Sequence, residues 1–261
     1  MKNVNTATII NQREAQNKAW FKHWFDSSFY HQLYANRDEK EAATFIDELV
    51  NELQPEIQSR MLDLGCGNGR HSKYLASKGF EVTGIDLAAS SIRQAKRWET
   101  DRLHFQRHDM RVPFGRNAFD HVFNFFTSFG YFDDPSEDHK VVSNIYSALR
   151  PGGVLVMDYI NSAPAERKLR TSEEKEIDGI IYNITRWTTE THFFKKIRIE
   201  NIGMAEPVEH IERVKKFSVD DFRNLFNSNG LQLEKVYGDY YLNDYDVQTS
   251  PRLILIAKKI K

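Results

Sequence analysis

The segment from Arg60 to Ala88, RMLDLGCGNGRHSKYLASKGFEVTGIDLA, constrains the fold most strongly. A short apolar strand runs into three closely spaced glycines, a helix follows and ends at Gly79, and a second strand comes after it. A strand, a helix and a second strand in this order predict a parallel β-sheet covered by helices. Because glycine allows a backbone to turn sharply and to approach a ligand closely, the loop after the first strand is a candidate cofactor site.

The spacing of the glycines decides between two kinds of cofactor. A dinucleotide fingerprint has the form G-x-G-x-x-G, and counting from Gly65 places Arg70 where a small residue is required. The third glycine, Gly69, comes one position early. Asp63, inside the first strand, is unfavourable beside a pyrophosphate, whereas Asp86, at the end of the second strand, can accept both hydroxyls of a ribose. The pattern therefore favours an adenosyl ligand that carries an ammonium and a sulfonium group over NAD.

The rest of the chain continues the alternation and then changes. A helix is expected at 89–99, then strands at 103–109 and 119–126, a helix at 138–149 and a strand at 154–160. Three antiparallel strands are expected between about 175 and 217, because no helical pattern separates these β-rich segments. A helix follows at 218–230, with Ser218 and Asp221 as its capping box, and strands follow at 231–241 and 250–259. At the other end, aromatic residues at 17–34 and an amphipathic stretch at 38–53 indicate two N-terminal helices.

Five motifs in order support an assignment to a family. LDLGCGNG, VTGIDLAASSI, HDM, FDHVFNFFTSFGYF and LRPGG, spread over residues 60–160, resemble the class I S-adenosylmethionine-dependent methyltransferases. The resemblance implies an α/β, Rossmann-like sheet of seven strands with an antiparallel terminal hairpin and helices on both faces. We expect residues 1–55 to form a helical lid and residues 56–261 the methyltransferase domain, with the small antiparallel sheet at about 175–217 inserted in it.

The resemblance also implies the residues that hold S-adenosylmethionine. Backbone of the glycine loop would contact the methionine part of the cofactor, Asp63 would lie beside that part, and Asp86 would bind the ribose. The full set implied is Arg37, Asp63, Gly65, Gly67, Asp86, Leu87, Asp109, Met110 and Phe125. Each aspartate also has a purely structural interpretation, as a cap, a turn residue or a partner of nearby backbone. Arg37, a candidate partner of the cofactor carboxylate, has the alternative of an ion pair with Asp38 or Glu41.

The acceptor side is less defined. Neither Asn-Pro-Pro-Tyr nor Asp-Pro-Pro-Tyr follows the fourth strand, which disfavours planar amines of adenine or glutamine as acceptors. No catalytic residue can be assigned, although Thr127, Ser128 and Tyr131, Asp158, Tyr159 and Asn161, Arg186, Glu209, His210 and Arg213, and Tyr240 and Tyr241 are placed where an acceptor would lie. Transfer to an N or O atom of a small molecule is expected. The alternatives are an RNA or protein methyltransferase and a non-enzymatic regulator that binds the cofactor.

Composition restricts the setting. A formal net charge of −1 gives no sign of a nucleic-acid partner, and the single cysteine, Cys66, allows no internal disulfide. No apolar run suggests a signal peptide or a membrane span, so a cytoplasmic location without a membrane partner is expected. No metal site is expected. The exposed edges of the inserted sheet would allow a homodimer.

Overall fold

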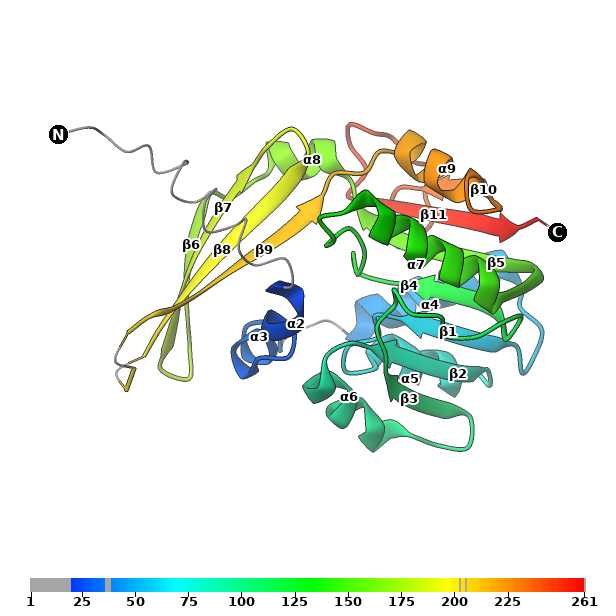
Figure 1. Cartoon of the computed structure of the whole chain (residues 1–261), viewed down its shortest axis with the longest axis horizontal. Helices are drawn as coiled ribbons and strands as arrows, with labels where there is room; N and C mark the ends of the chain where they lie inside the picture. The colour runs from blue at the N-terminus through cyan, green and yellow to red at the C-terminus, as the bar shows by residue number, and fades with distance from the viewer. Residues whose placement is uncertain (1–19, 36–38, 202, 205, 261) are drawn as a thin grey trace.

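The computed structural model describes residues 20–35, 39–201, 203–204 and 206–260, and within them the chain forms two β-sheets (Figure 1). The larger sheet has seven strands in the order β10-β11-β5-β4-β1-β2-β3. Its strands are β1 Arg60–Leu64, β2 Glu81–Asp86, β3 Leu103–Arg107, β4 Phe119–Asn124, β5 Leu149–Ile160, β10 Leu231–Tyr237 and β11 Arg252–Lys259. β1 to β5 run parallel, whereas β11 is antiparallel to both β5 and β10. The predicted α/β class and the reversed terminal strands are confirmed.

Helices cover both faces of this sheet, as predicted. They are α4 Glu39–Leu53, α5 Arg70–Ser77, α6 Ala89–Ala95 with a 3₁₀ turn at Lys96–Trp98, α7 Pro135–Ala148, α8 Ser162–Arg167 and α9 Val219–Asn227. Successive strand residues point to opposite faces. In β1, Leu62 therefore shares a buried cluster with residues of α7 and α9, while Met61 shares another with residues of α4, α5 and α6. Burial on both sides explains why these strands are so apolar.

The order of the strands fixes where a ligand can bind. β1 connects outward to β2 and β3, whereas β4 and β5 lie on its other side, so the chain changes direction between β1 and β4. In open α/β sheets the crevice beyond the carboxyl ends of the strands at such a point is the usual ligand site. The glycine loop follows β1 at this edge, and the segment starting at Phe125 follows β4.

The inserted sheet has four strands rather than the three predicted. They are β6 Ser172–Ile177, β7 Ile180–Thr188, β8 His192–Asn201 and β9 Val208–Lys215, each antiparallel to the next. The sequence pattern missed β6 because it contains four charged residues in a row, Glu173 to Glu176. Such a composition is common at the edge of a sheet, where charge discourages pairing with other chains. β6 pairs only with β7 among the described strands.

Two short N-terminal helices lie between the two sheets (Figure 1). These are α2 Trp20–Trp24 and α3 Ser28–Leu33. α4 packs instead on α5 and buries Phe45, Ile46 and Leu49 against the main sheet. The predicted domain boundary at residue 55 stays a prediction. α2 and α3 are the described elements that lie where a lid over the ligand edge would lie.

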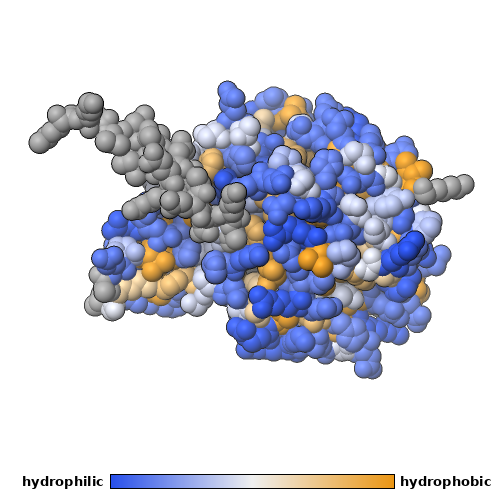
Figure 2. Space-filling model, viewed as in Figure 1, coloured by the Kyte–Doolittle hydropathy of each residue, from blue (hydrophilic) through white to orange (hydrophobic). Residues whose placement is uncertain are grey.

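The visible surface is mostly hydrophilic, with small scattered hydrophobic patches (Figure 2). Of the helices that the structure describes, none is both long enough and apolar enough to cross a membrane. Nor do the described residues contain a cluster of three or more His, Cys, Asp or Glu side chains that could hold a metal ion. The capping box predicted for α9 is present: Ser218 Oγ accepts from the amide of Asp221, and the Asp221 carboxylate accepts from the amide of Ser218.

Candidate active site

The glycine loop forms one wall of a cavity. Gly65, Gly67 and Gly69 all have positive φ angles, of 82°, 57° and 85°. A β-carbon on Gly65 would lie 2.7 Å from that of Ser128, and one on Gly69 would lie 2.5 Å from the Phe105 ring, so close packing requires glycine at both positions. At Gly67 no heavy atom lies within 4 Å of an added β-carbon. Gly67 therefore presents open backbone to the cavity, as close approach of a ligand would require.

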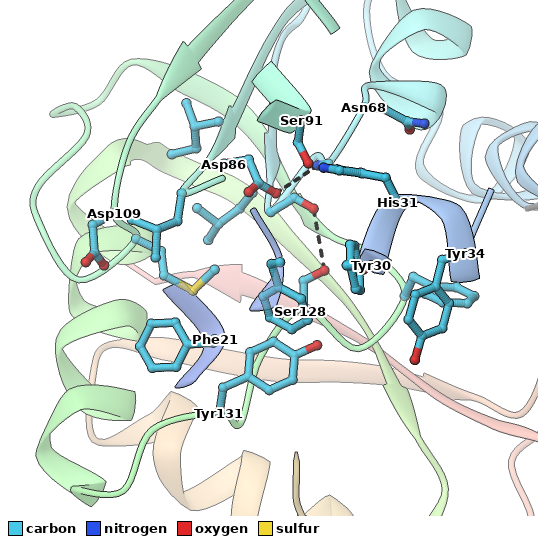
Figure 3. Close-up of a pocket in the computed structure, with 18 of the residues that line it drawn as sticks. Phe21, Tyr30, His31, Tyr34, Asn68, Asp86, Ser91, Asp109, Ser128 and Tyr131 are labelled. Carbon is cyan, nitrogen blue, oxygen red and sulfur yellow. Dashed lines mark hydrogen bonds between the residues drawn. The ribbon is translucent and has the colours of Figure 1, made fainter. Parts of the chain in front are cut away.

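The cavity has a volume of about 400 Å³ and lies between the carboxyl edge of the main sheet and the N-terminal helices (Figure 3). This volume is within the range of small-ligand pockets, roughly 300–1,000 Å³. Its walls come from four parts of the chain: the glycine loop, the ends of β2 and β3, the loop after β4, and a roof made of α2, α3 and β9. The residues from the sheet side include Leu64, Gly65, Gly67, Ile85, Asp86, Leu87, Asp109 and Met110.

Asp86 connects the end of β2 to the glycine loop. Its Oδ2 accepts from the Gly67 amide at 2.9 Å, and its Oδ1 accepts from the Ala88 amide at 2.8 Å. These two bonds fix the carboxylate at the cavity wall, where Figure 3 shows it. A carboxylate so placed can accept hydrogen bonds from vicinal hydroxyls. The adjacent Leu87 adds an apolar surface to the same wall.

Asp109 and Met110 also line the cavity, two and three residues after β3 ends. Arg111 binds the Asp109 carboxylate through Nε at 3.0 Å and Nη2 at 2.7 Å. Burial tends to raise the pKa of Asp109, but the hydrogen bonds and charge of Arg111 outweigh burial and lower it. Asp109 is therefore an ionised turn residue held by Arg111, and its place in the wall is also compatible with the predicted contact to an adenine amino group.

Asp63 and Phe125 are not among the residues that line the cavity. Asp63 is buried under the glycine loop, where Oδ2 accepts from Ser72 Oγ at 2.6 Å and Oδ1 has no hydrogen-bond partner among the described residues. Burial, reinforced by the nearby charge of Asp86, raises the pKa of Asp63 to about 7. Phe125 is buried and stacks on His71, with ring centroids 4.4 Å apart. The next residue, Phe126, lines the cavity instead.

Arg37 lies outside the described residues, so its predicted role stays a prediction. Cys66 is buried, and burial raises the pKa of its thiol well above the usual value. A protonated, buried thiol is unsuited to act as a nucleophile. Cys66 is therefore a small residue of the turn.

The loop after β4 has an unusual backbone. Phe126 and Thr127 both have positive φ angles, 55° and 59°, although neither is glycine. The buried Asp158 carboxylate accepts from the Phe126 amide at 2.8 Å and from Arg252 Nε at 2.7 Å, and Arg252 also donates to Thr127 Oγ1 at 2.9 Å. Non-glycine residues keep such conformations only where their surroundings enforce them. Asp158 thus holds the loop that brings Phe126, Ser128 and Tyr131 to the cavity.

The roof presents aromatic side chains and the carboxylate of Glu212 to the cavity. Six roof and loop side chains, Trp20, Phe21, Phe25, Tyr30, Tyr34 and Tyr131, line the cavity together with Glu212 of β9. Glu212 Oε1 accepts from Trp24 Nε1 and from Tyr34 Oη, both at 2.7 Å. These bonds attach α2 and the end of α3 to the inserted sheet.

A second set of contacts attaches the roof to the main domain. Ser90, at the start of α6, bonds through Oγ to Asp26 Oδ1 at 2.6 Å and to His31 Nε2 at 2.7 Å. The Ser90 amide also donates to Asp26 Oδ1 at 2.6 Å. The segment of α2 and α3 is therefore tied to β9 at one side and, at the other, to α6.

Of the acceptor-side residues proposed from sequence, the structure brings Ser128 and Tyr131 to the cavity. Glu209 and Arg213 instead pair with Lys196 and Asp133. Sequence reasoning missed Glu212. Alternation along β9 was the available signal, because the His210 ring packs against Trp24 while Glu212 and Val214 line the cavity. These alternate residues therefore share the face of β9 toward α2 and the cavity.

The donor set fits S-adenosylmethionine. The open backbone at Gly67 suits the amino-acid part of the cofactor, and the fixed carboxylate of Asp86, at the end of β2, suits its ribose. The apolar surface of Leu87 and Met110 suits its adenine. The cofactor would supply a methyl group activated on a sulfonium. This chain would supply binding, orientation and exclusion of water beneath the aromatic roof.

Comparisons with known proteins agree with this fit. Residues 61–153 match the family model described as a methyltransferase domain. A putative methyltransferase of Geobacillus sp. (strain WCH70) is 25% identical over 248 residues, covering 92% of this chain and 98% of that protein. The glycine N-methyltransferase of Rattus norvegicus is 30% identical over 147 residues, covering 50% of each chain.

Among solved structures, an S-adenosylmethionine-dependent methyltransferase from Clostridium acetobutylicum ATCC 824 has a TM-score of 0.73. The match covers 97% of this chain and 100% of that one, at 16% sequence identity. At this identity the likeness shows the fold, including the insertion and the N-terminal helices within the covered length.

Proposed function

Because this chain is a class I S-adenosylmethionine-dependent methyltransferase, we propose that it transfers the methyl group to an N or O atom of a small molecule held beneath the aromatic roof. The observation that carries the proposal is the aromatic roof over the cavity. Aromatic residues of α2, α3 and the loop after β4 line the cavity of about 400 Å³ together with the glycine loop. Hydrogen bonds tie α2 and α3 to β9 and to α6. A roofed site of this size suits a small acceptor better than a polymer.

The rat relative supports a small acceptor, since its name gives glycine as the molecule it methylates, although it matches only half of this chain. The same roof argues against RNA or a protein as the acceptor, because either would have to enter as an extended segment or a flipped base. A regulator that only binds the cofactor would not need the carboxylate that Glu212 adds to the cavity lining.

The experiment follows a tritium-labelled methyl group from S-adenosylmethionine into a cell extract separated by ultrafiltration into small molecules, protein and RNA. The proposal expects label in the small-molecule fraction and none above a boiled-protein control in the others. Label confined to RNA or protein would refute the small-molecule acceptor. Label in no fraction, with the cofactor still bound, would favour the regulator.

A further inference from the structure

Among the described roof residues, Glu212 is the acidic one that lines the cavity, and the cofactor wall does not account for it. Its side chain is 15% exposed. The groups that would contact the cofactor, Gly67, Asp86 and Met110, come from the main sheet, whereas Glu212 comes from the inserted sheet. A carboxylate that is mostly withdrawn from water is costly unless charge or hydrogen bonds compensate it.

The two oxygens of Glu212 are compensated unequally. Oε1 accepts two hydrogen bonds of 2.7 Å, from Trp24 and Tyr34. Among the described residues, the closest cation to Oε2 is Lys195 Nζ at 3.8 Å, beyond hydrogen-bond distance. Burial lowers the pKa of Lys195, although the charge of Glu212 opposes this effect. Oε2 therefore has capacity to accept a hydrogen bond from a ligand. Because the negative charge of Glu212 is only partly balanced by Lys195, a ligand that carries or develops positive charge is favoured.

The aromatic residues beside Glu212 add to this preference. Trp20, Phe25, Tyr30 and Tyr131 form one contiguous cluster, with ring centroids of contacting pairs 5.0–5.7 Å apart in edge-to-face geometry. All four line the cavity. Aromatic rings stabilise ammonium groups through their quadrupoles, and alkylated ammonium groups are recognised by such clusters.

We propose that the acceptor is an amine and that Glu212 is the residue that selects it, by accepting a hydrogen bond from its N–H through Oε2 beneath the ring cluster. This inference rests on the proposed function. The acceptor nitrogen enters the site neutral, having left its proton in the solvent. Its lone pair forms the bond to the methyl carbon while the carbon–sulfur bond breaks and that electron pair stays on sulfur. The nitrogen becomes a cation, which the carboxylate and the rings stabilise.

An oxygen acceptor would use the same site less well. A hydroxyl has a single hydrogen, which it must lose on methylation, so the neutral ether product has nothing to donate to Glu212. A methylated primary or secondary amine keeps at least one N–H and gains the charge. Glu212 therefore stabilises the charged amine product through a hydrogen bond and its charge, and it offers neither contribution to the neutral ether.

The first experiment asks which chemical class accepts the label. The small-molecule fraction of a cell extract is divided, and one half is treated with acetic anhydride in bicarbonate, which acylates amines, and then quenched. The intact protein and tritium-labelled S-adenosylmethionine are added to both halves. We expect acylation to remove at least nine-tenths of the transfer. Undiminished transfer after acylation, or labelled product that releases methanol in alkali, would overturn the amine and leave the methyltransferase assignment intact.

The second experiment tests Glu212 with a matched control. Glu212→Gln keeps an oxygen for Trp24 and Tyr34 and removes the charge, whereas Glu209→Gln changes a residue of the same strand that pairs with Lys196 and does not line the cavity. Losing a charge-assisted hydrogen bond should reduce transfer to the untreated fraction about ten- to hundredfold in Glu212→Gln, mainly through the apparent KM for the fraction. Glu209→Gln should stay within about twofold of wild type.

Binding of S-adenosylhomocysteine separates this role from two others. We expect both variants to bind it within about twofold of wild type, since Glu212 contacts the acceptor. A tenfold loss of this affinity in Glu212→Gln alone would place the cofactor's own ammonium at Glu212 and overturn the inference. Unchanged transfer in Glu212→Gln would overturn it as well.

Discussion

Gly67 offers the sharpest test of where the cofactor binds, because replacing it changes the ligand space and little else. In Gly67→Ala the added methyl would lie at the cavity wall with no protein atom within 4 Å, so no steric clash with the protein is expected. The φ angle of 57° is ideal left-handed helix, which costs an L-residue about 1–2 kcal/mol. Reduced freedom of the unfolded chain offsets roughly 0.4–1 kcal/mol of this cost. The net loss of stability should be about 1 kcal/mol, or about 2–4 °C in Tm.

The effect on the ligand should be larger. A methyl group forced into a close contact costs about 1–3 kcal/mol, which corresponds to roughly a five- to 150-fold increase in Kd. Gly79→Ala is the matched control, because Gly79 also has a positive φ, of 97°, and no atom within 4 Å of an added β-carbon, but it lies in the turn before β2 and does not line the cavity. It should lose similar or somewhat greater stability and bind normally.

The assay is titration calorimetry with S-adenosylhomocysteine, alongside thermal unfolding of each variant. Gly67→Ala should lose affinity while Gly79→Ala retains that of wild type. Equal affinity in Gly67→Ala and wild type would show that the ligand does not approach the backbone of Gly67, and the assignment of the glycine loop would fail.

Other predictions concern the carboxylates and the roof. Asp86→Asn should raise the Kd for S-adenosylhomocysteine about ten- to hundredfold, because an amide cannot accept at both positions that now face backbone N–H groups; calorimetry would show retained affinity if Asp86 only caps the strand. The pKa of Asp63 is about 7 in the folded protein and 3.8 in the unfolded chain, so the folded protein holds a proton that the unfolded chain releases. The free energy of unfolding should therefore fall as pH rises from 3.8 to 7, by at most roughly 4 kcal/mol from this group. His121, whose pKa burial lowers to about 4, acts in the opposite direction, so the measurement is the difference in urea unfolding between wild type and Asp63→Asn, which should grow from pH 5 to pH 8 in favour of the variant; a constant difference would contradict it. Ser90→Ala removes the side-chain bond to Asp26, and hydrogen exchange at residues 20–35 should quicken; unchanged exchange would show that this contact does not hold the roof.

Local sequence signals account for the main sheet well. Apolar strands that end in glycine or aspartate, and helices that end in glycine, gave the alternation around β1 and β2, and the resemblance supplied the reversed terminal strands. The charged β6 did not fit this pattern, because an edge strand is held by backbone pairing and need not be apolar. Its place beside β7 is set by the short turn at Asp178 and Gly179, both at positive φ.

The sequence also placed Gly67, Asp86 and Met110 in the cavity wall, where the structure has them. Each lies at or just after the carboxyl end of one of three successive strands of the same sheet. The acceptor side could not be predicted in this way. Glu212 and Tyr34 are 178 residues apart, and their contact depends on how the inserted sheet packs against the N-terminal helices. Nothing local to either residue indicates that packing, which explains why the roof was predicted as a lid without its carboxylate.

The most direct test of the central claim is a calorimetric titration of the wild-type protein with S-adenosylhomocysteine, with NAD as the comparison ligand. The structure predicts saturable heat at one site per chain for S-adenosylhomocysteine and none for NAD, because Arg70 stands where the dinucleotide fingerprint requires a small residue. Absence of heat with S-adenosylhomocysteine, or binding of NAD in its place, would contradict the account.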